Sequence, residues 1–421
     1  MKPNFSLTLL ACLVASPLPA LAGGLMLYEV GSDGVGLANA GAAARAQGPA
    51  TLASNVAGMA LLSGTQVSGG AQLLHGNMRF EVDEDTTVAG GDSGNAVEWI
   101  PAASLFITHE LGDGWSVGFA NYGDFGLSVD YEDDWSGRYF LQDGALMGMT
   151  FMPSVAYKFN DQWAVGLGLI GYYAMLSNEL AVNNVNPLLS DGRATFEADD
   201  WSYGASLGVI YAPRPGTRLG LSYTSEIDLE FEDKMELEGL GPLATNALQN
   251  RGVLDAATTL KMQVPQTLTF SLYHELDTQW ALLASANWQD WSRFGEVGID
   301  LDTNQPKSAS LNAKFKDTWH LSLGTQYRLD PRWMWTAGIG YDSSAVDDED
   351  RSITVPMGEN WRFATGLTHV LDEQTEVNLS YEFVWMGDMP VSQEKPNGDR
   401  ISGGFEGAWI QALSTSVTWR F

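Results

Sequence analysis

Residues 23–59 read GGLMLYEVGSDGVGLANAGAAARAQGPATLASNVAGM. This stretch is mostly Gly, Ala and Ser, so it has neither the alternation of a strand nor enough large side chains for a core of its own. Another part of the chain must therefore enclose it. After Gly64 the sequence becomes a series of short alternating segments with aromatic ends, which is typical of a transmembrane β-barrel. We predict an all-β fold in which residues 63–421 form the barrel and residues 23–62 form a plug inside its lumen.

The first residues are typical of an exported protein. Lys2 precedes an apolar run at residues 5–14, and Ala-Leu-Ala at residues 20–22 has the small-x-small form of a signal-peptidase site. We therefore predict a signal peptide over residues 1–22. The alternative is lipidation at Cys12, the only cysteine, although a bulky leucine precedes it by two residues and the apolar run continues beyond it.

The composition argues against two classes of protein. The chain has 22 Lys and Arg against 52 Asp and Glu, and the net charge of −30 argues against nucleic acid as a partner. With 45% hydrophobic and 11% aromatic residues, the chain is not of the disordered class. Beyond the signal, no apolar run approaches the roughly 18 residues of a membrane helix, so a membrane-spanning form must be a closed barrel.

One local pattern recurs six times: an aromatic or His residue, a tight polar turn, then usually Trp and a new alternating run. It occurs as THELGDGW at residues 108–115, YKFNDQW at 157–163, YAPRPGTRL at 211–219, YHELDTQW at 273–280, YRLDPRW at 327–333 and THVLDEQT at 368–375. Turn residues flanked by aromatics fit the short turns and the interfacial girdle of an outer-membrane barrel. Six turns join twelve strands, and one more strand at each end makes fourteen, with both termini on the periplasmic side.

Residues 375–385 show the alternation clearly. One face carries Val377, Leu379, Tyr381, Phe383 and Trp385, and the other carries Glu376, Asn378, Ser380, Glu382 and Val384. The first face suits lipid and the second suits a lumen. A soluble sandwich also alternates, but it does not usually place Trp or Tyr at both ends of nearly every strand.

Long loops are expected on the side opposite the short turns, for example at residues 124–147 and 386–403. They hold much of the acidic excess, which indicates either a solvated acidic rim or the binding of divalent cations that bridge lipopolysaccharide. Two of the loops also carry apolar residues: Leu180, Val182, Leu188, Leu189, Leu237, Leu240, Leu243 and Leu248. If these are exposed, they offer a landing site for an apolar ligand, and the alternative is that the two loops pack on each other.

The third predicted strand is interrupted. Trp115, Val117 and Phe119 set its lipid-facing phase, but the next two positions in that phase are Asn121 and Gly123. A polar residue and a residue without a side chain leave a hole in the wall, and Gly inside a strand often marks a bulge. The sequence therefore predicts a lateral opening, unless the strand has already left the bilayer at Asn121.

These features resemble the FadL family of outer-membrane transporters for long-chain fatty acids and other hydrophobic compounds, across essentially the whole mature chain. The N-terminal stretch is similar to the plug of that family, with Asn55, Val56, Ala57 and Gly58 at its Asn-Pro-Ala motif and Val56 in place of the proline. Asn121-Tyr122-Gly123 is similar to the sequence at the kink in the third strand of that family.

The resemblance implies a monomeric 14-stranded barrel in the bacterial outer membrane that works by diffusion. A hydrophobic ligand, a fatty acid or a hydrocarbon, would be captured at the extracellular loops and held in a pocket touched by Leu25, Met26 and Leu27. It would then leave sideways through the gap at the third strand. The implied partners are this ligand, outer-membrane lipid and lipopolysaccharide.

One departure concerns the carboxylate of a fatty acid. The family holds that group with basic side chains, and Met175 stands where the alignment of the fifth strand would place an Arg. Lys314 and Lys316 remain as candidate partners, and a less polar cargo stays open.

Two motif matches resemble catalytic chemistry but lie in strands. Residues 204–208, GASLG, match the G-x-S-x-G of hydrolases, and residues 166–171, GLGLIG, match a dinucleotide-binding G-x-G-x-x-G. Neither has the strand-to-helix context that its chemistry needs, and the five histidines lack metal-ligand spacing. We expect no enzyme, catalytic residue, cofactor or metal. The alternatives are a general porin for polar solutes, which a plug argues against, and an outer-membrane lipid hydrolase with a distant Ser-His pair.

Overall fold

The structure is a computed structural model that describes residues 30–421 except 98, 185, 187, 250–253, 255, 303–306 and 355. The predicted signal peptide and the first residues of the predicted plug lie outside the described residues. In the part of the chain that is described, no helix combines the length and the apolar character needed to cross a membrane.

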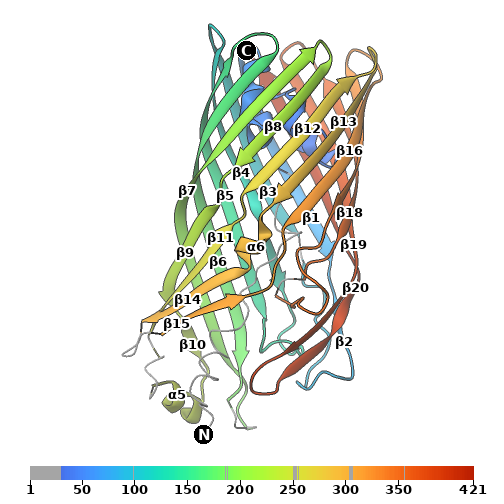
Figure 1. The fold of residues 1–421 in the computed structure, drawn as a ribbon. Coiled ribbons are helices and arrows are strands. Elements are labelled where there is room, and N and C mark those ends of the chain that lie inside the picture. Colours follow the sequence, from blue (N-terminus) through green and yellow to red (C-terminus); the bar gives the residue numbers. More distant parts are fainter. Residues whose placement is uncertain are drawn as a thin grey trace.

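Within the described residues, fourteen antiparallel strands form a closed barrel, because the first strand pairs with both the second and the last (Figure 1). Around the wall they are β1 (Thr65–Asn77), β3 (Ile100–Gly112), β4 (Trp115–Asp130), β5 (Asp143–Lys158), β6 (Trp163–Val182), β7 (Gly192–Arg214), β8 (Thr217–Thr224), β12 (Thr267–Glu275), β13 (Trp280–Gln289), β16 (Thr318–Arg328), β17 (Trp333–Asp342), β18 (Asn360–Val370), β19 (Thr375–Glu394) and β20 (Arg400–Arg420). The predicted 14-stranded barrel is confirmed. Closure removes the free sheet edges that lipid could not satisfy.

All six predicted turns join neighbouring strands at one end of the barrel, the end at the top of Figure 1. Four of them share one construction, in which an Asp or Asn side chain accepts the backbone N–H groups of the second and third residues after it. In the turn between β12 and β13, the N–H groups of Gln279 and Trp280 donate to Asp277 Oδ1 at 2.7 and 2.8 Å. Asn160, Asp330 and Asp372 do the same in their turns. This side-chain capping explains why Asp or Asn recurs there.

The predicted alternation is also confirmed. In β19, Leu379 is 53% exposed and faces the membrane side, whereas Ser380 is 1% exposed and faces the lumen. Aromatic rings form a girdle at the short-turn end, where Trp163 stacks on Tyr211 and Trp333 stacks on His369, with ring centroids 4.3 and 3.8 Å apart. Such a girdle is typical of the membrane interface.

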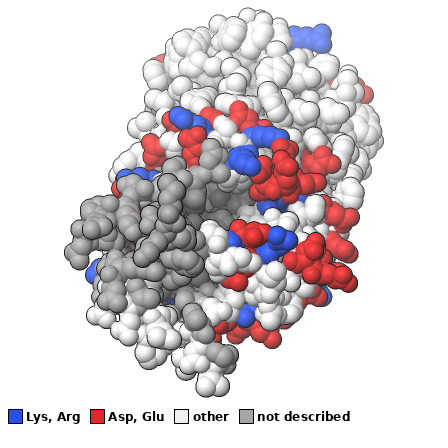
Figure 2. All heavy atoms as spheres, turned by 60° about the horizontal axis from the view of Figure 1, so that its bottom comes forward, with Lys and Arg blue, Asp and Glu red and all other residues white. Residues whose placement is uncertain are grey.

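The opposite end is more elaborate than the sequence predicts. Four strands form a separate sheet that bends over the mouth: β9 (Ile227–Lys234), β11 (Ala257–Val264), β14 (Glu296–Asp302) and β15 (Lys307–Asn312). The short strands β2 (Phe80–Val82) and β10 (Glu236–Glu238) pair with β20 and β7, and the helices α5 (Pro242–Gln249) and α6 (Trp291–Phe294) lie at the same end. Figure 2 shows Asp and Glu gathered here, whereas the visible wall is mostly uncharged.

The loops at this end are shorter than the sequence predicts. The strands β4 and β5 continue into the predicted loop at residues 124–147 and leave only 131–142 between them. Likewise, β19 and β20 continue into the predicted loop at residues 386–403. The strands extend because their polar outer ends still pair with each other in water, where hydropathy no longer marks a strand.

Residues 30–62, here called the luminal segment, lie inside the barrel toward the short-turn end (Figure 1). The segment contains four short helices: α2 (Ser32–Val35), α3 (Ala42–Arg45), α4 (Thr51–Ser54) and the 3₁₀ helix η1 (Val56–Leu61). Its apolar side chains Leu37, Ala44 and Val56 are fully buried against the wall or within the segment. This segment has no large core of its own, so the barrel supplies its surroundings.

Candidate functional site: the luminal segment, a cavity and a gap in the wall

The luminal segment contacts the wall where the wall has no side chain. A Cβ atom added at Gly338 would lie 2.1 Å from the Leu37 carbonyl oxygen, and one at Gly208 would lie 2.0 Å from Asn55 Oδ1. Because no substituted residue tolerates such distances, these glycines are required for the close approach. Gly208 is the last glycine of the G-x-S-x-G match, and its close contact with Asn55 gives this glycine a packing role.

Asn55 is the centre of this contact. It is fully buried at the N-terminus of η1, and its Oδ1 accepts the N–H of Ala57 at 3.0 Å. Its Nδ2 donates to the carbonyl oxygens of Ala43 at 2.7 Å and of Val209 in β7 at 3.1 Å. One side chain thus fixes the turn into η1, joins it to α3 and attaches both to the wall.

A buried group of charged residues holds the opposite side of the luminal segment. Asp342 accepts from His320 Nδ1 at 2.9 Å and from Arg362 Nε at 2.7 Å, and Arg362 Nη1 contacts Glu382 at 3.1 Å. His320 Nε2 lies 3.2 Å from the carbonyl oxygen of Ala38 in the luminal segment. Buried charges that are paired in this way specify one arrangement, because removal of one partner leaves an uncompensated charge.

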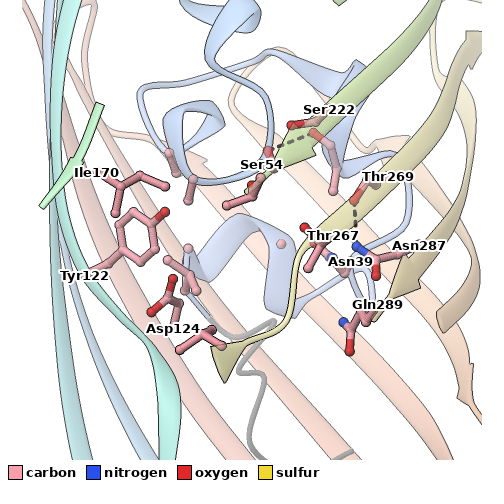
Figure 3. Close-up of a pocket in the computed structure, with 18 of the residues that line it drawn as sticks. Asn39, Ser54, Tyr122, Asp124, Ile170, Ser222, Thr267, Thr269, Asn287 and Gln289 are labelled. Carbon is pink, nitrogen blue, oxygen red and sulfur yellow. Dashed lines mark hydrogen bonds between the residues drawn. The ribbon is translucent and has the colours of Figure 1, made fainter. Parts of the chain in front are cut away.

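A cavity of about 130 Å³ lies between the luminal segment and the wall. Figure 3 shows Tyr122, Asp124 and Ile170 on one side of it and Thr267, Thr269, Asn287 and Gln289 on the other, with Asn39 and Ser54 contributed by the luminal segment. Asn287 Nδ2 donates to Thr269 Oγ1 at 2.6 Å. The lining is more polar than an apolar cargo alone would need.

The wall beside this cavity has a gap, which we call the β3/β4 gap. Pairing of β3 with β4 ends at Ser104 and Tyr122. Beyond that point β3 pairs with β1 alone and residues 123–129 of β4 pair with β5 alone, as far as the described residues show. The register of β4 against β5 also shifts between Gly123 and Phe125, which is a β-bulge. The structure thus places the predicted Asn121, Tyr122 and Gly123 at the end of the regular wall.

The apolar residues of the outer loops divide into two groups. Leu248 is buried with Val182, Leu237 and Leu240 packed around it, and Leu180 is buried as well. Leu188, Leu189 and Leu243 are exposed, at 90%, 43% and 69%. Four of the eight side chains thus pack between the two loops, and three remain accessible, so capture of a ligand by the exposed leucines stays a prediction.

The loops at the mouth are also joined by polar contacts. Arg138 Nε and the Tyr139 hydroxyl both contact Asp191, at 3.0 and 2.9 Å. Burial, together with the neighbouring Asp191 carboxylate, raises the pKa of Tyr139. The hydroxyl therefore stays protonated and donates to Asp191 at all ordinary pH values.

The basic candidates do not meet the cavity. Lys314 forms an ion pair with Asp350 and Lys316 with Asp347, both on exposed parts of the outer end, and neither lines the cavity. Met175 lies on the outward face of β6 and is 42% exposed, whereas Ala174 and Leu176 face inward. The identity of residue 175 therefore says nothing about the head group that the lumen can hold. Leu25, Met26 and Leu27 lie outside the described residues.

The sequence analysis missed Asp124, Thr150 and Tyr172, which surround the β3/β4 gap. The sequence does contain one signal for this site. Asp124 directly follows Gly123, and it is the first charged side chain of the predicted strand that begins at Trp115. An ionisable residue at membrane depth indicates a functional position.

A closed barrel with an aromatic girdle and an occluded lumen defines a class of protein, the outer-membrane β-barrel proteins. The profile of the family described as "Outer membrane protein transport protein (OMPP1/FadL/TodX)" matches residues 12–421, and the chain belongs to this family. The long-chain fatty acid transport protein of Escherichia coli O6:H1 is 26% identical over 396 residues, which cover 87% of each chain.

Two solved structures share the fold. A Pseudomonas aeruginosa FadL homologue superimposes with a TM-score of 0.87 at 19% identity, covering 94% of this chain and 99% of that one. The Ralstonia pickettii toluene transporter TbuX gives a TM-score of 0.69 at 17% identity, covering 93% and 98%.

Proposed function

We propose that this protein is a passive outer-membrane channel for long-chain fatty acids or similar hydrophobic molecules. In this proposal a molecule is captured at the extracellular loops, passes into the cavity beside the luminal segment and leaves laterally through the β3/β4 gap. Membership of a family of outer-membrane transport proteins supports this, as do relatives named for the transport of long-chain fatty acids and of toluene.

The observation that carries the proposal is the position of the gap. Tyr122 is the last residue of β4 that pairs with β3, and it also lines the cavity together with Asp124. An apolar molecule in the cavity therefore lies next to the point in the described wall where β4 stops pairing with β3. Lateral release into lipid costs such a molecule less free energy than release into water.

Three further assignments belong to this proposal. Leu188, Leu189 and Leu243 are the accessible residues for capture at the outer loops. The luminal segment would be the plug, and Leu25, Met26 and Leu27, which lie outside the described residues, keep the proposed role of touching the ligand. Lys314 and Lys316 would hold a carboxylate only after release from Asp350 and Asp347.

The test is to close the gap with Gly123→Val. A Cβ atom at this position would lie 3.5 Å from the Gly148 carbonyl oxygen, an ordinary contact, so the strand accepts the side chain. We expect uptake of a labelled fatty acid or toluene into proteoliposomes to fall at least about tenfold, equivalent to about 1.4 kcal/mol of added barrier.

The matched control is Gly69→Val in β1, where a Cβ atom meets nothing within 4 Å. Both variants must show the heat-dependent gel mobility of an inserted barrel. Unchanged uptake in a correctly inserted Gly123→Val barrel would rule out release through the gap.

A further inference from the structure

On the cavity side of the β3/β4 gap, two buried polar atoms have no hydrogen-bond partner among the described residues. Asp124 Oδ2 accepts from the Thr150 hydroxyl at 3.2 Å, and the amide of Asn121 donates to the Thr150 carbonyl oxygen at 3.1 Å. The second carboxylate oxygen, Asp124 Oδ1, and the hydroxyl of Tyr172 are buried without a hydrogen-bond partner among the described residues. Tyr172 is 1% exposed, and both residues line the cavity.

Tyr172 is held in place by the strand opposite it. A Cβ atom at Gly148 in β5 would lie 1.8 Å from the Tyr172 hydroxyl oxygen, so this oxygen occupies the space that a side chain would otherwise take. Phe106 and Tyr122 pack together on the other flank of the gap, with ring centroids 5.8 Å apart. The position of the Tyr172 hydroxyl is thus set by its packing over Gly148, and Asp124 is held through its contact with Thr150.

The described lining of the cavity offers no available cation to an entering anion. Among the described lining residues Arg45 is the sole cation, and it is engaged by Asp33, whose Oδ2 lies 2.6 Å from Arg45 Nη2. Asp124 forms no ion pair within the described part of the chain. An entering carboxylate therefore finds no available cation in the described lining and would keep the cost of its own desolvation, which disfavours it.

We propose that the cavity at the β3/β4 gap selects neutral apolar molecules that carry a hydroxyl group, with Asp124 Oδ1 accepting the hydroxyl proton. This inference rests on the proposed function and names the cargo class of the same site. A buried acceptor without a partner strongly favours a ligand that supplies a donor, because it otherwise keeps its desolvation penalty.

The size of the cavity narrows the class further. An engineered apolar cavity of about 150 Å³ holds benzene, so about 130 Å³ suits one aromatic ring. A phenol-type molecule combines that size with a single hydroxyl donor.

The experiment compares three ligands on one scaffold: p-cresol, p-xylene and p-toluate, which differ only in a hydroxyl, a methyl or a carboxylate group. Binding to the purified full chain in detergent micelles is measured by ligand-observed NMR at neutral pH, with empty micelles as the blank. We expect p-cresol to bind about tenfold more tightly than p-xylene, as one added hydrogen bond to a buried acceptor predicts, and p-toluate to bind most weakly.

Two variants test the assigned atom. Asp124→Leu should reduce the preference for p-cresol over p-xylene to about onefold, and Tyr172→Phe, which keeps the ring, should retain most of it. Asp134→Asn on the exposed loop is the matched control and should change nothing.

The outcomes separate this inference from the proposed function. Equal binding of p-cresol and p-xylene by the wild type, or an undiminished preference in Asp124→Leu, would overturn the inference while leaving a hydrophobic channel intact. Absence of binding by all three, together with absence of fatty acid uptake, would overturn the proposed function as well.

Discussion

At the scale of single residues, the luminal segment depends most on Asn55. Its amide joins α3, η1 and β7 through three directed hydrogen bonds, in a position with no exposed surface. Val56, which follows it, stands where the family motif has proline, so the side chain of Asn55 carries more of the order in this turn. The backbone of Asn55 is extended, with φ −158° and ψ 104°, which a following residue of either kind accepts.

We expect Asn55→Ala to loosen the luminal segment without unfolding the barrel. Loss of this side chain leaves buried backbone groups unsatisfied, which costs about 1–3 kcal/mol. Trypsin cleavage after the buried Arg45 reports the opening, and its rate should rise about 5- to 150-fold if cleavage follows the open population.

The control for this experiment is Asn397→Ala, an exposed outer-loop position that should cleave like the wild type. An unchanged rate of cleavage after Arg45 in Asn55→Ala would show that the segment is held without this side chain.

At the scale of elements, the short turns are built by side-chain capping. The amide donors of Gln279 and Trp280 lower the pKa of Asp277, and the N–H of Gln374 does the same for Asp372. A carboxyl group whose pKa is lowered in the folded state stabilises that state above the usual pKa of Asp, near 3.9, and loses this effect as the pH falls through the folded value.

We therefore expect Asp277→Ala to lower the midpoint of thermal unfolding in micelles at about pH 7, and its difference from the wild type to shrink as the pH falls below about 3.9 through the lowered folded pKa. Asp277→Asn should stay close to the wild type over this pH range, because Asn160 already builds the same turn with an amide oxygen. A difference between Asp277→Ala and the wild type that does not change with pH would refute a contribution from the charge of the carboxylate, and a destabilised Asp277→Asn would refute capping by the side-chain oxygen.

At the scale of the whole molecule, the barrel is filled at its outer end and its wall loses β3–β4 pairing on one side. The outer mouth is filled by a buried apolar cluster that includes Tyr131, Trp135, Trp291 and Phe294, and the luminal segment fills the lumen below it. The β3/β4 gap interrupts the wall between these two fillings. In the proposed function, an apolar molecule would therefore move sideways through the wall, and the two fillings would block axial flow of water and ions.

Deletion of residues 23–62 should convert the protein into an open pore. The glycines at positions 208 and 338 would then face an empty lumen, and swelling of proteoliposomes in sugar solutions should become rapid, whereas the wild type should swell little. Equal swelling of the two proteins would show that the luminal segment is not the barrier to polar solutes.

The strand pattern, the turns and the closure of the barrel were predictable from the sequence because they rest on local rules. Side chains alternate with a period of two, an Asp or Asn caps the N–H groups of the second and third residues after it, and aromatics mark the interface. Each of these signals lies within about ten residues. The interruption at Asn121 and Gly123 was visible for the same reason.

Only the tertiary structure decided which distant segments contact each other and which way their side chains face. Strand register turned Met175 outward, loop contacts paired Lys314 with Asp350, and the bulge after Gly123 brought Asp124 into a cavity with Tyr172. A one-residue shift moves a side chain to the other face of a wall, and ion pairs form between loops far apart in the chain. The local pattern therefore specifies a barrel with a filled lumen, whereas the position of each polar side chain depends on how the fourteen strands and their loops come together.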